Sequence, residues 1–333
     1  MTRSHARSSL AWLPGFVLLS AVWGSSFALI KIALEAGVAP PWVAFARCAL
    51  GALTLLVICV LTRTPLPRDR ATWGHAAVVA VLANTVPFVL LAYGEQHVDS
   101  VLAGLLNATT PLMTLLFVPL LVPTERITAR GVAGLLIGFA GVLCVLGVWR
   151  GVAGGTVAGT LACLGSTASY GASFAYMQRF FAGRSGSASA LSAAQLVCAS
   201  VELAVVAPAL AGLPHWPGVP AAVALLALGA LGTGLAYVLN LGVVRAAGPT
   251  VASTVTYIIP VWSTTIGAVL LAEPVGWNTV VGVSWWLLGS SSPASPTGPE
   301  GGGCATGPAP RSRSVSFGAP CRAFVTLDGI VPA

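Results

Sequence analysis

The sequence repeats runs of about 20 apolar residues, the length of a helix that crosses a hydrocarbon core roughly 30 Å thick. Of its 333 residues, 56% are hydrophobic and 8% are charged, whereas soluble domains carry about 25% charged residues. The runs are continuously apolar and do not alternate with a period of two, which favours helices over membrane-barrel strands. We therefore predict an all-α integral membrane protein with ten spans, near 11–32, 42–61, 75–94, 100–122, 129–148, 157–178, 189–211, 220–243, 249–271 and 275–289.

The positive residues predict the orientation of these spans. With a cytoplasmic N-terminus, only Lys31 and Arg150 fall in outer segments and Arg47 falls inside a helix. All other Lys and Arg residues then lie on the cytoplasmic side, as expected for inner loops. The net charge of +7 is therefore a topology signal. Because the arginines are spread over separate loops, they do not form the basic face of a nucleic-acid-binding protein. We read the first run as a retained helix, since no clear cleavage site follows it.

Two halves of the chain share landmarks at a nearly constant offset of 147 to 149 residues. A repeat of five spans is odd-numbered, so its second copy must cross the membrane in the opposite sense. Inverted repeats of this kind are typical of transporters that work by alternating access. We predict a ten-helix bundle of two inverted five-helix repeats, 12–148 and 157–289. The matched landmarks are the segments 23–28 and 170–175, Arg47 and Gln195, Pro111 and Pro260, and Glu125 and Glu273.

Several segments resemble the EamA family of the drug/metabolite transporter superfamily over residues 12–282. They are WGSSFALIK, ARCALGAL, TVPFVLLAYGEQHVDSVLAGLLNATTPLMTLLF, ERITARGVAGLLIGFAGVLCVLG, LGTGLAYVLNLGVV and ASTVTYIIPVWSTTIGAVLLAEPV. The resemblance implies a secondary transporter of the bacterial inner membrane, usually an exporter of metabolites or amphipathic drugs. The motifs are specific for the family and carry almost no information about the substrate.

Polar side chains within apolar spans usually face the bundle interior and mark a solute pathway. Amphipathic aromatic residues accompany them here. Arg47 would hold a substrate carboxylate or an acidic partner by a forked pair; the alternative is that it reaches the near interface along its own stem. The candidate pathway residues are Trp23, Ser26, Arg47, Asn84, Tyr93, Asn107, Tyr170, Gln195, Tyr237, Asn240 and Tyr257.

Three further residues have candidate roles in coupling and movement. Glu202 is a carboxylate near the middle of a span, two turns after Gln195, so desolvation would let it cycle a proton. The alternative is a paired or neutral acid that serves packing. Pro111 and Pro260 lie within spans four and nine after polar runs, where a missing backbone donor favours a hinge. Common membrane-helix kinks are the alternative.

The C-terminal segment 290–333 is rich in Gly, Pro, Ser and Arg. One interpretation is a natural disordered tail. Another is a frameshift near Val283 that leaves a shortened tenth helix, which sequencing of the coding DNA would decide.

We expect no enzyme activity, cofactor or metal site. The four histidines lie at span edges or in loops, and the seven cysteines show no paired ligand spacing. The expected partners are a small-molecule substrate and the lipid bilayer, with the chain a monomer or homodimer. Two alternatives stay open: a non-transporting membrane sensor or assembly subunit, and a sugar or lipid-linked carrier of the same superfamily.

Overall fold

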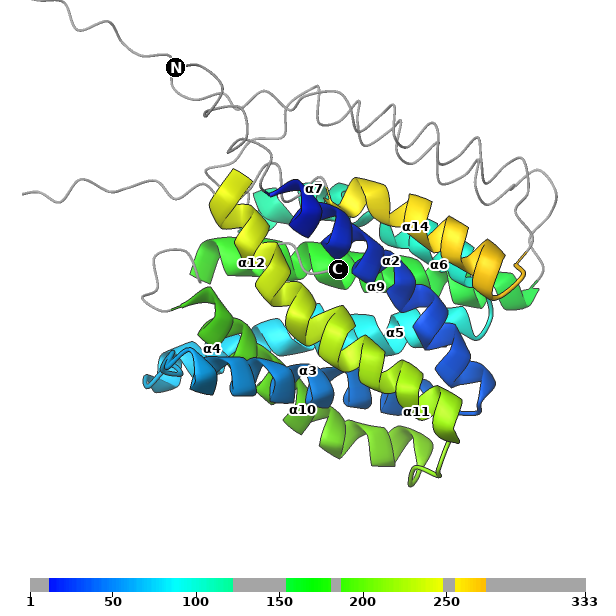
Figure 1. The fold of residues 1–333 in the computed structure, drawn as a ribbon, viewed down its shortest axis with the longest axis horizontal. Coiled ribbons are helices and arrows are strands. Elements are labelled where there is room, and N and C mark those ends of the chain that lie inside the picture. The colour runs from blue at the N-terminus through cyan, green and yellow to red at the C-terminus, as the bar shows by residue number, and fades with distance from the viewer. Residues whose placement is uncertain (1–11, 122–153, 181–186, 248–254, 274–333) are drawn as a thin grey trace, which may run out of the picture.

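The computed structural model describes residues 12–121, 154–180, 187–247 and 255–273 (Figure 1). These residues form a bundle of helices. The first half contributes α2 (Leu13–Glu35), α3 (Pro40–Leu61), α4 (Arg70–Ala80), the π-helical segment η1 (Val81–Thr85), α5 (Val86–Glu95), α6 (Ser100–Asn107) and α7 (Thr110–Leu121). The second contributes α9 (Gly154–Phe180), α10 (Ala188–Ala211), α11 (Val219–Leu226), the π-helical η3 (Ala227–Leu235), α12 (Ala236–Ala247) and α14 (Val255–Leu270).

Six helical stretches in the described segments are long and apolar enough to cross a membrane, and the apolar helix 258–270 is shorter. Span three is α4, η1 and α5 in succession, span four is α6 and α7, and span eight is α11, η3 and α12. Eight of the predicted spans fall wholly or largely on described residues, and there they are helical. The predicted fifth and tenth spans, 129–148 and 275–289, lie outside the described residues. The described part of the chain is thus all-helical, and the chain is a multi-pass membrane protein.

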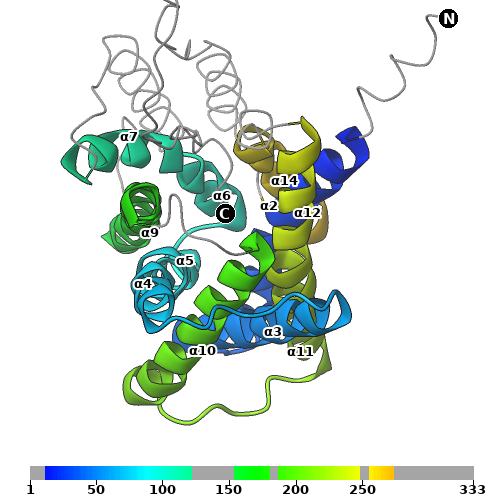
Figure 2. The same ribbon diagram turned by 90° about the vertical axis from the view of Figure 1, so that its left-hand side faces the viewer.

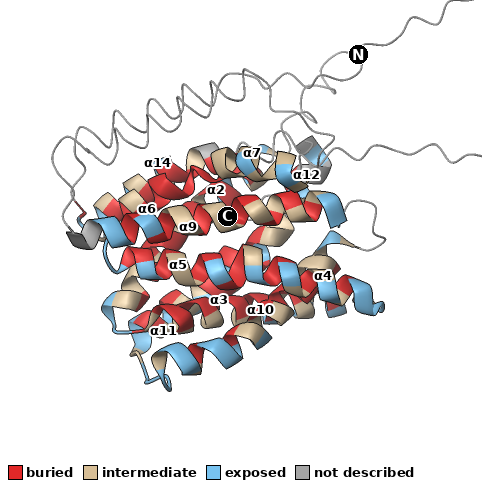
Figure 3. Ribbon diagram, turned by 180° about the vertical axis from the view of Figure 1, so that it is seen from behind, coloured by how far each residue is buried: buried red, intermediate tan, exposed pale blue. Residues whose placement is uncertain are grey.

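Large apolar side chains are exposed on the exterior of the bundle, where the lipid bilayer would surround it. On α3, Leu53, Val57 and Val60 are exposed, and on α10 Val201 and Val205 are exposed. Figure 3 shows buried residues along the inner sides of the same helices. Because lipid tails are as apolar as these side chains, apolar residues on the exterior of a membrane bundle need no burial against protein.

α9 is rich in Gly, Ala, Ser and Thr, which explains why it falls outside the six strongly apolar stretches. It packs against α5, α6 and α7 (Figure 2). Its counterpart in the first half, α2, packs against α14 and against the three segments of span eight. Span six therefore packs on spans three and four, and span one packs on the equivalent spans eight and nine.

Matched glycines mark these crossings. Gly24 on α2 meets Trp262 of α14, where a Cβ would overlap the Trp262 Cβ. Gly171 on α9 meets Met113 of α7, where a Cβ would lie 2.6 Å from the Met113 carbonyl carbon. The two glycines are 147 residues apart, and their two partners are 149 residues apart. Only a residue without a side chain lets the backbones approach this closely, so the duplication visible in the sequence is also visible in the packing.

Candidate functional site

A hydrogen-bonded group of polar side chains lies inside the bundle, and we call Asn84, Gln195 and Tyr237 the amide cluster. The side-chain nitrogen Nε2 of Gln195 donates to Oδ1 of Asn84 at 2.5 Å. The Asn84 Nδ2 donates to the Tyr237 hydroxyl at 3.3 Å. Asn84 is fully buried and Gln195 is 8% exposed. The three residues come from spans three, seven and eight, so both halves of the chain build the cluster.

Arg47 lies inside the bundle beside the amide cluster. It is 3% exposed, so it does not reach the interface along its stem. Its Nε donates to the Thr233 hydroxyl at 2.9 Å, and its guanidinium carbon lies 3.9 Å from the centroid of the Phe88 ring. These contacts supply a hydroxyl and an aromatic face, and the described residues give Arg47 no carboxylate hydrogen bond. A buried guanidinium in this environment can bind the anionic group of a ligand.

Two π-helical segments position threonines at equivalent places in the two halves. Thr85 ends η1 and Thr233 lies in η3, at an offset of 148. Thr85 donates to Oε2 of Glu202 at 2.5 Å, while Thr233 accepts from Arg47. Thr85 thus joins span three to span seven of the other half, and Thr233 joins span eight to span two of the other half. π-Helical turns leave the regular backbone pattern and occur frequently at functional sites.

Glu202 lies on the side of α10 that turns toward the bundle exterior. It is partly buried, and its neighbour Val201 is 62% exposed. The Thr85 hydroxyl is its hydrogen-bond partner. Glu202 is therefore two turns from the amide cluster on the same helix, at the boundary between the core and the apolar surface.

Three of the predicted pathway residues carry buried polar atoms without a partner in the described part of the chain. These atoms are Nε1 of Trp23, the hydroxyl of Tyr170 and Oδ1 of Asn107. Tyr170 packs edge-on to Phe88 with ring centroids 6.5 Å apart, which places it next to Arg47. Buried polar atoms without a protein partner are rare in native proteins, and a bound ligand or an ordered water commonly satisfies them.

Span four breaks at the predicted proline. α6 ends at Asn107 and α7 begins at Thr110, immediately before Pro111. Proline removes the backbone donor that would bond the Asn107 carbonyl one turn earlier. The Thr110 hydroxyl donates to that carbonyl instead, at 2.7 Å. The matched Pro260 lies within the continuous described helix α14, so the break is a feature of the first half.

The remaining predicted residues lie apart from the amide cluster or outside the description. Ser26 on α2 donates to the Val22 carbonyl and faces Gly232, where a Cβ would lie 3.1 Å from the Ser26 hydroxyl. Tyr93 is 41% exposed, and its ring packs against His97. Asn240 is partly buried on α12. The side chain of Tyr257 and all of Glu125 lie outside the described residues.

A second polar group lies at the end of the bundle that holds Lys31, Glu95, Ser100 and Glu273; we call it the Lys31 end. Glu273 accepts three hydrogen bonds at the start of α6: from the Ser100 N–H at 2.9 Å, the Ser100 hydroxyl at 2.9 Å and the Val101 N–H at 3.0 Å. A carboxylate at a helix N-terminus satisfies backbone donors that have no partner within the helix. Glu273 therefore joins the end of span nine to the start of span four.

Lys31 and Glu95 belong to the same end. The Lys31 ammonium donates to the backbone carbonyls of Glu95 at 2.8 Å and Val98 at 3.2 Å, at the C-terminus of α5. Glu95 is fully buried, and both of its carboxyl oxygens lack a hydrogen-bond partner among the described residues. The sequence carries one signal for this group: Lys31 and Glu95 both lie at span ends on the same, outer side in the predicted topology.

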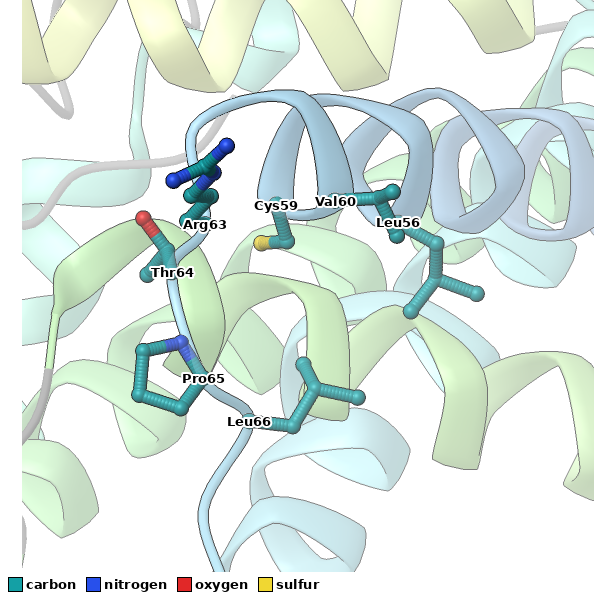
Figure 4. Close-up of a pocket in the computed structure, with 7 residues that line it drawn as sticks. All are labelled: Leu56, Cys59, Val60, Arg63, Thr64, Pro65 and Leu66. Carbon is teal, nitrogen blue, oxygen red and sulfur yellow. The ribbon is translucent and has the colours of Figure 1, made fainter.

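A shallow pocket of about 220 Å³ lies between the last turns of α3 and residues 63–66 (Figure 4). Its lining is mostly apolar and it lies at the opposite end of α3 from Pro40, away from the amide cluster. We place no function there, because no buried polar side chain is directed into it. The described residues also contain no group of three or more His, Cys, Asp and Glu side chains arranged to hold a metal ion.

Several bacterial proteins are similar to this chain over part or most of its length. The uncharacterized inner membrane transporter YedA of Escherichia coli K12 is 29% identical over 271 residues, which is 80% of this chain and 84% of that protein. Protein PagO of Salmonella typhimurium is 28% identical over 131 residues, 39% of this chain and 42% of PagO. An uncharacterized transporter of Buchnera aphidicola is 28% identical over 100 residues, so the match spans 30% of this chain and only a third of that relative.

A solved crystal structure shares the fold with a TM-score of 0.59 at 20% sequence identity, over 86% of this chain and 96% of the other. The model of the EamA-like transporter family matches twice, over residues 10–147 and 157–291. The two matches follow the duplication seen in the motif offsets and in the glycine crossings. The chain belongs to the EamA-like transporter family.

Proposed function

We propose that this protein exports small metabolites or amphipathic compounds across the bacterial inner membrane by alternating access, with the solute bound at the amide cluster and Arg47. The observation that carries the proposal is that buried polar side chains from spans two, three, seven and eight meet at one place. Sites between two repeats near the bilayer centre are typical of secondary transporters. The Phe88 and Tyr170 rings beside the cluster suit a solute with an apolar part.

The proposed architecture is ten helices in two inverted five-helix repeats, 12–148 and 157–289, with the N-terminus in the cytoplasm. Two features support it. The pairings of α2 with α14 and of α9 with α7 are exchanged between the halves, as an axis relating inverted repeats requires. The arginine distribution favours the stated orientation, which makes the Lys31 end the outer end. The family assignment favours transport over a sensor or assembly role.

The test of the site is an efflux and resistance screen in a strain that lacks its own exporters, with a panel of amphipathic compounds. Gln195→Leu keeps a similar side-chain volume and leaves Asn84 Oδ1 without its donor. The loss should destabilise the solute site by about 1–3 kcal/mol. We expect export to fall about tenfold, since 1.4 kcal/mol corresponds to a factor of ten. The matched control is Gln96→Leu at an exposed position after α5, which should export as the wild type does. Equal export by both variants would remove the amide cluster from the pathway.

Energy coupling by protons is the finer part of the proposal, with Glu202 as a candidate carrier. Its partial burial and its single hydroxyl partner would let it change protonation as the bundle rearranges. Efflux driven by an imposed pH gradient should be lost in Glu202→Gln while the protein remains in the membrane. Unchanged proton-driven efflux in that variant would exclude Glu202 from coupling.

The proline break in span four supplies the proposed hinge. The Asn107 carbonyl is held by a hydroxyl and not by a backbone donor, so the junction of α6 and α7 lacks one of the backbone hydrogen bonds that would resist bending there. Pro260 is the proposed second hinge by repeat symmetry.

A further inference from the structure

The Lys31 end holds two buried carboxyl groups in opposite surroundings. Glu273 accepts three hydrogen bonds, from two backbone N–H groups and one hydroxyl. Glu95 accepts none in the described part of the chain, although it is fully buried. Carboxylates with several donors are stable in the charged form, whereas a buried carboxylate without donors is not. When environments separate two acids in this way, the two groups take different protonation states.

Glu95 lies near the Lys31 ammonium, but its carboxyl group does not pair with that cation. The Lys31 ammonium on α2 donates its hydrogen bonds to the backbone carbonyls of Glu95 and Val98. The other titratable or charged groups near Glu95 are Cys163 on α9, Arg47 on α3 and Glu273 after the end of α14. The neighbouring elements α6 and η1 carry none. Glu95 thus has a positive charge nearby that could balance its ionised form, and no donor that would fix it in that form.

Close packing keeps water from Glu95 in this conformation. A Cβ at the neighbouring Gly94 would overlap Cys163 Sγ and lie 3.0 Å from the Gly159 carbonyl. Gly159 in turn packs on His97 and Val98 of the first half, where its Cβ would lie 2.7 Å from the His97 Cβ. α5 and α9 therefore meet backbone to backbone next to Glu95, whose side chain is fully buried.

We propose that Glu95 is a proton-binding site at the outer end of the transport pathway, protonated in the conformation described here and deprotonated when that end opens to water. The carboxylic acid O–H bond breaks on opening, the proton passes to water outside, and the Lys31 ammonium balances the carboxylate that remains. On closure the carboxylate takes a proton from water again. The inference rests on the proposed transport function, and it concerns the opening of the outer end, separate from the coupling proposed for Glu202.

The test is infrared difference spectroscopy of the full chain in lipid vesicles, titrated with pH, because the C=O stretch of a carboxylic acid is separate from that of a carboxylate. We expect a protonated carboxyl band at neutral pH that Glu95→Gln removes and that Glu35→Gln, a change at an exposed acid, retains. Lys31→Met should shift loss of the band to higher pH, because removing the nearby cation disfavours the ionised form. Glu95→Asp should keep a band, which separates loss of the proton site from loss of folding.

The result that would overturn the proposal is a wild-type spectrum without this band at neutral pH, or a band that persists in Glu95→Gln. The spectra do not depend on transport, so they stand even if the export screen fails. Conversely, a confirmed band with no export in any assay would leave the proton site intact and count against the proposed transport direction and substrates only.

Discussion

The three hydrogen bonds of Glu273 predict that one substitution will open the Lys31 end. In Glu273→Gln the charge is lost and one of the two acceptor oxygens becomes an NH₂ group, so at least one N–H of Ser100 or Val101 loses its acceptor. Hydrogen bonds to charged groups contribute about 1.5–3 kcal/mol each, and a buried donor left unsatisfied costs a similar amount. We therefore expect the closed arrangement to lose about 3 kcal/mol, which corresponds to a population shift of roughly 100-fold.

The assay is the reaction rate of a membrane-impermeant maleimide with Val101→Cys in a background that lacks the natural cysteines. Val101 is 4% exposed, and its backbone N–H is retained by the substitution. If closing is faster than labelling, the rate reports the population of the open state. Adding Glu273→Gln should raise the rate up to about 100-fold, whereas adding Glu35→Gln, an exposed acid at the end of α2, should leave it unchanged.

Labelling in right-side-out and inside-out vesicles gives the orientation in the same experiment. The proposed topology expects reaction from the outer side only. Equal labelling rates with and without Glu273→Gln, within about threefold, would refute the reasoning that this carboxylate holds spans four and nine together.

Two further predictions concern helix crossings and the break in span four. Gly104→Ala places a Cβ 2.6 Å from the Ser263 Cβ, so the melting temperature in detergent should fall by an amount equivalent to about 1–3 kcal/mol of overpacking; Gly74→Ala, with nothing within 4 Å, should be neutral or slightly stabilising, and equal effects would contradict the crossing. Pro111→Ala restores a backbone donor to the Asn107 carbonyl, so thermal stability should rise while the export rate falls, and a variant that exports normally would argue against a hinge there.

The spans and the duplication could be predicted from the sequence because both depend on local composition and on register. An apolar run of helical length has few alternatives in lipid, and the described helices accordingly match the predicted ranges to within a few residues. The start of the ninth predicted span lies outside the described residues. The motif offset of 147 to 149 residues reappears as the paired crossings of Gly24 and Gly171. The burial of Arg47 was left open by the sequence, because its distance from the span end allowed either direction.

Contacts across the chain could not be predicted in the same way. Glu95 was placed outside span three because the predicted span ended one residue earlier, and its burial arises from α2 and α9, which are distant in sequence. Glu273 finds its donors 172 and 173 residues away. Tyr93 was grouped with the pathway because it is amphipathic and lies within a span, yet its position on the helix turns it to the surface. A residue's face within a bundle depends on neighbours that hydropathy does not identify.

The π-helical segments have a consequence for insertions and deletions. Each residue of an α-helix turns the chain by about 100° and advances it by about 1.5 Å. Removing one residue from η3, such as Gly232, would let span eight run as a regular α-helix while its hydropathy stayed almost the same. Because a π-helical turn holds about one residue more than an α-helical turn, the residues on either side would keep their mutual orientation, and the Tyr237 hydroxyl would stay near Asn84. A single-codon deletion in η3 would thus be tolerated by the interior, whereas the same deletion in the regular helix α10, between Gln195 and Glu202, would turn these two side chains apart by about 100°.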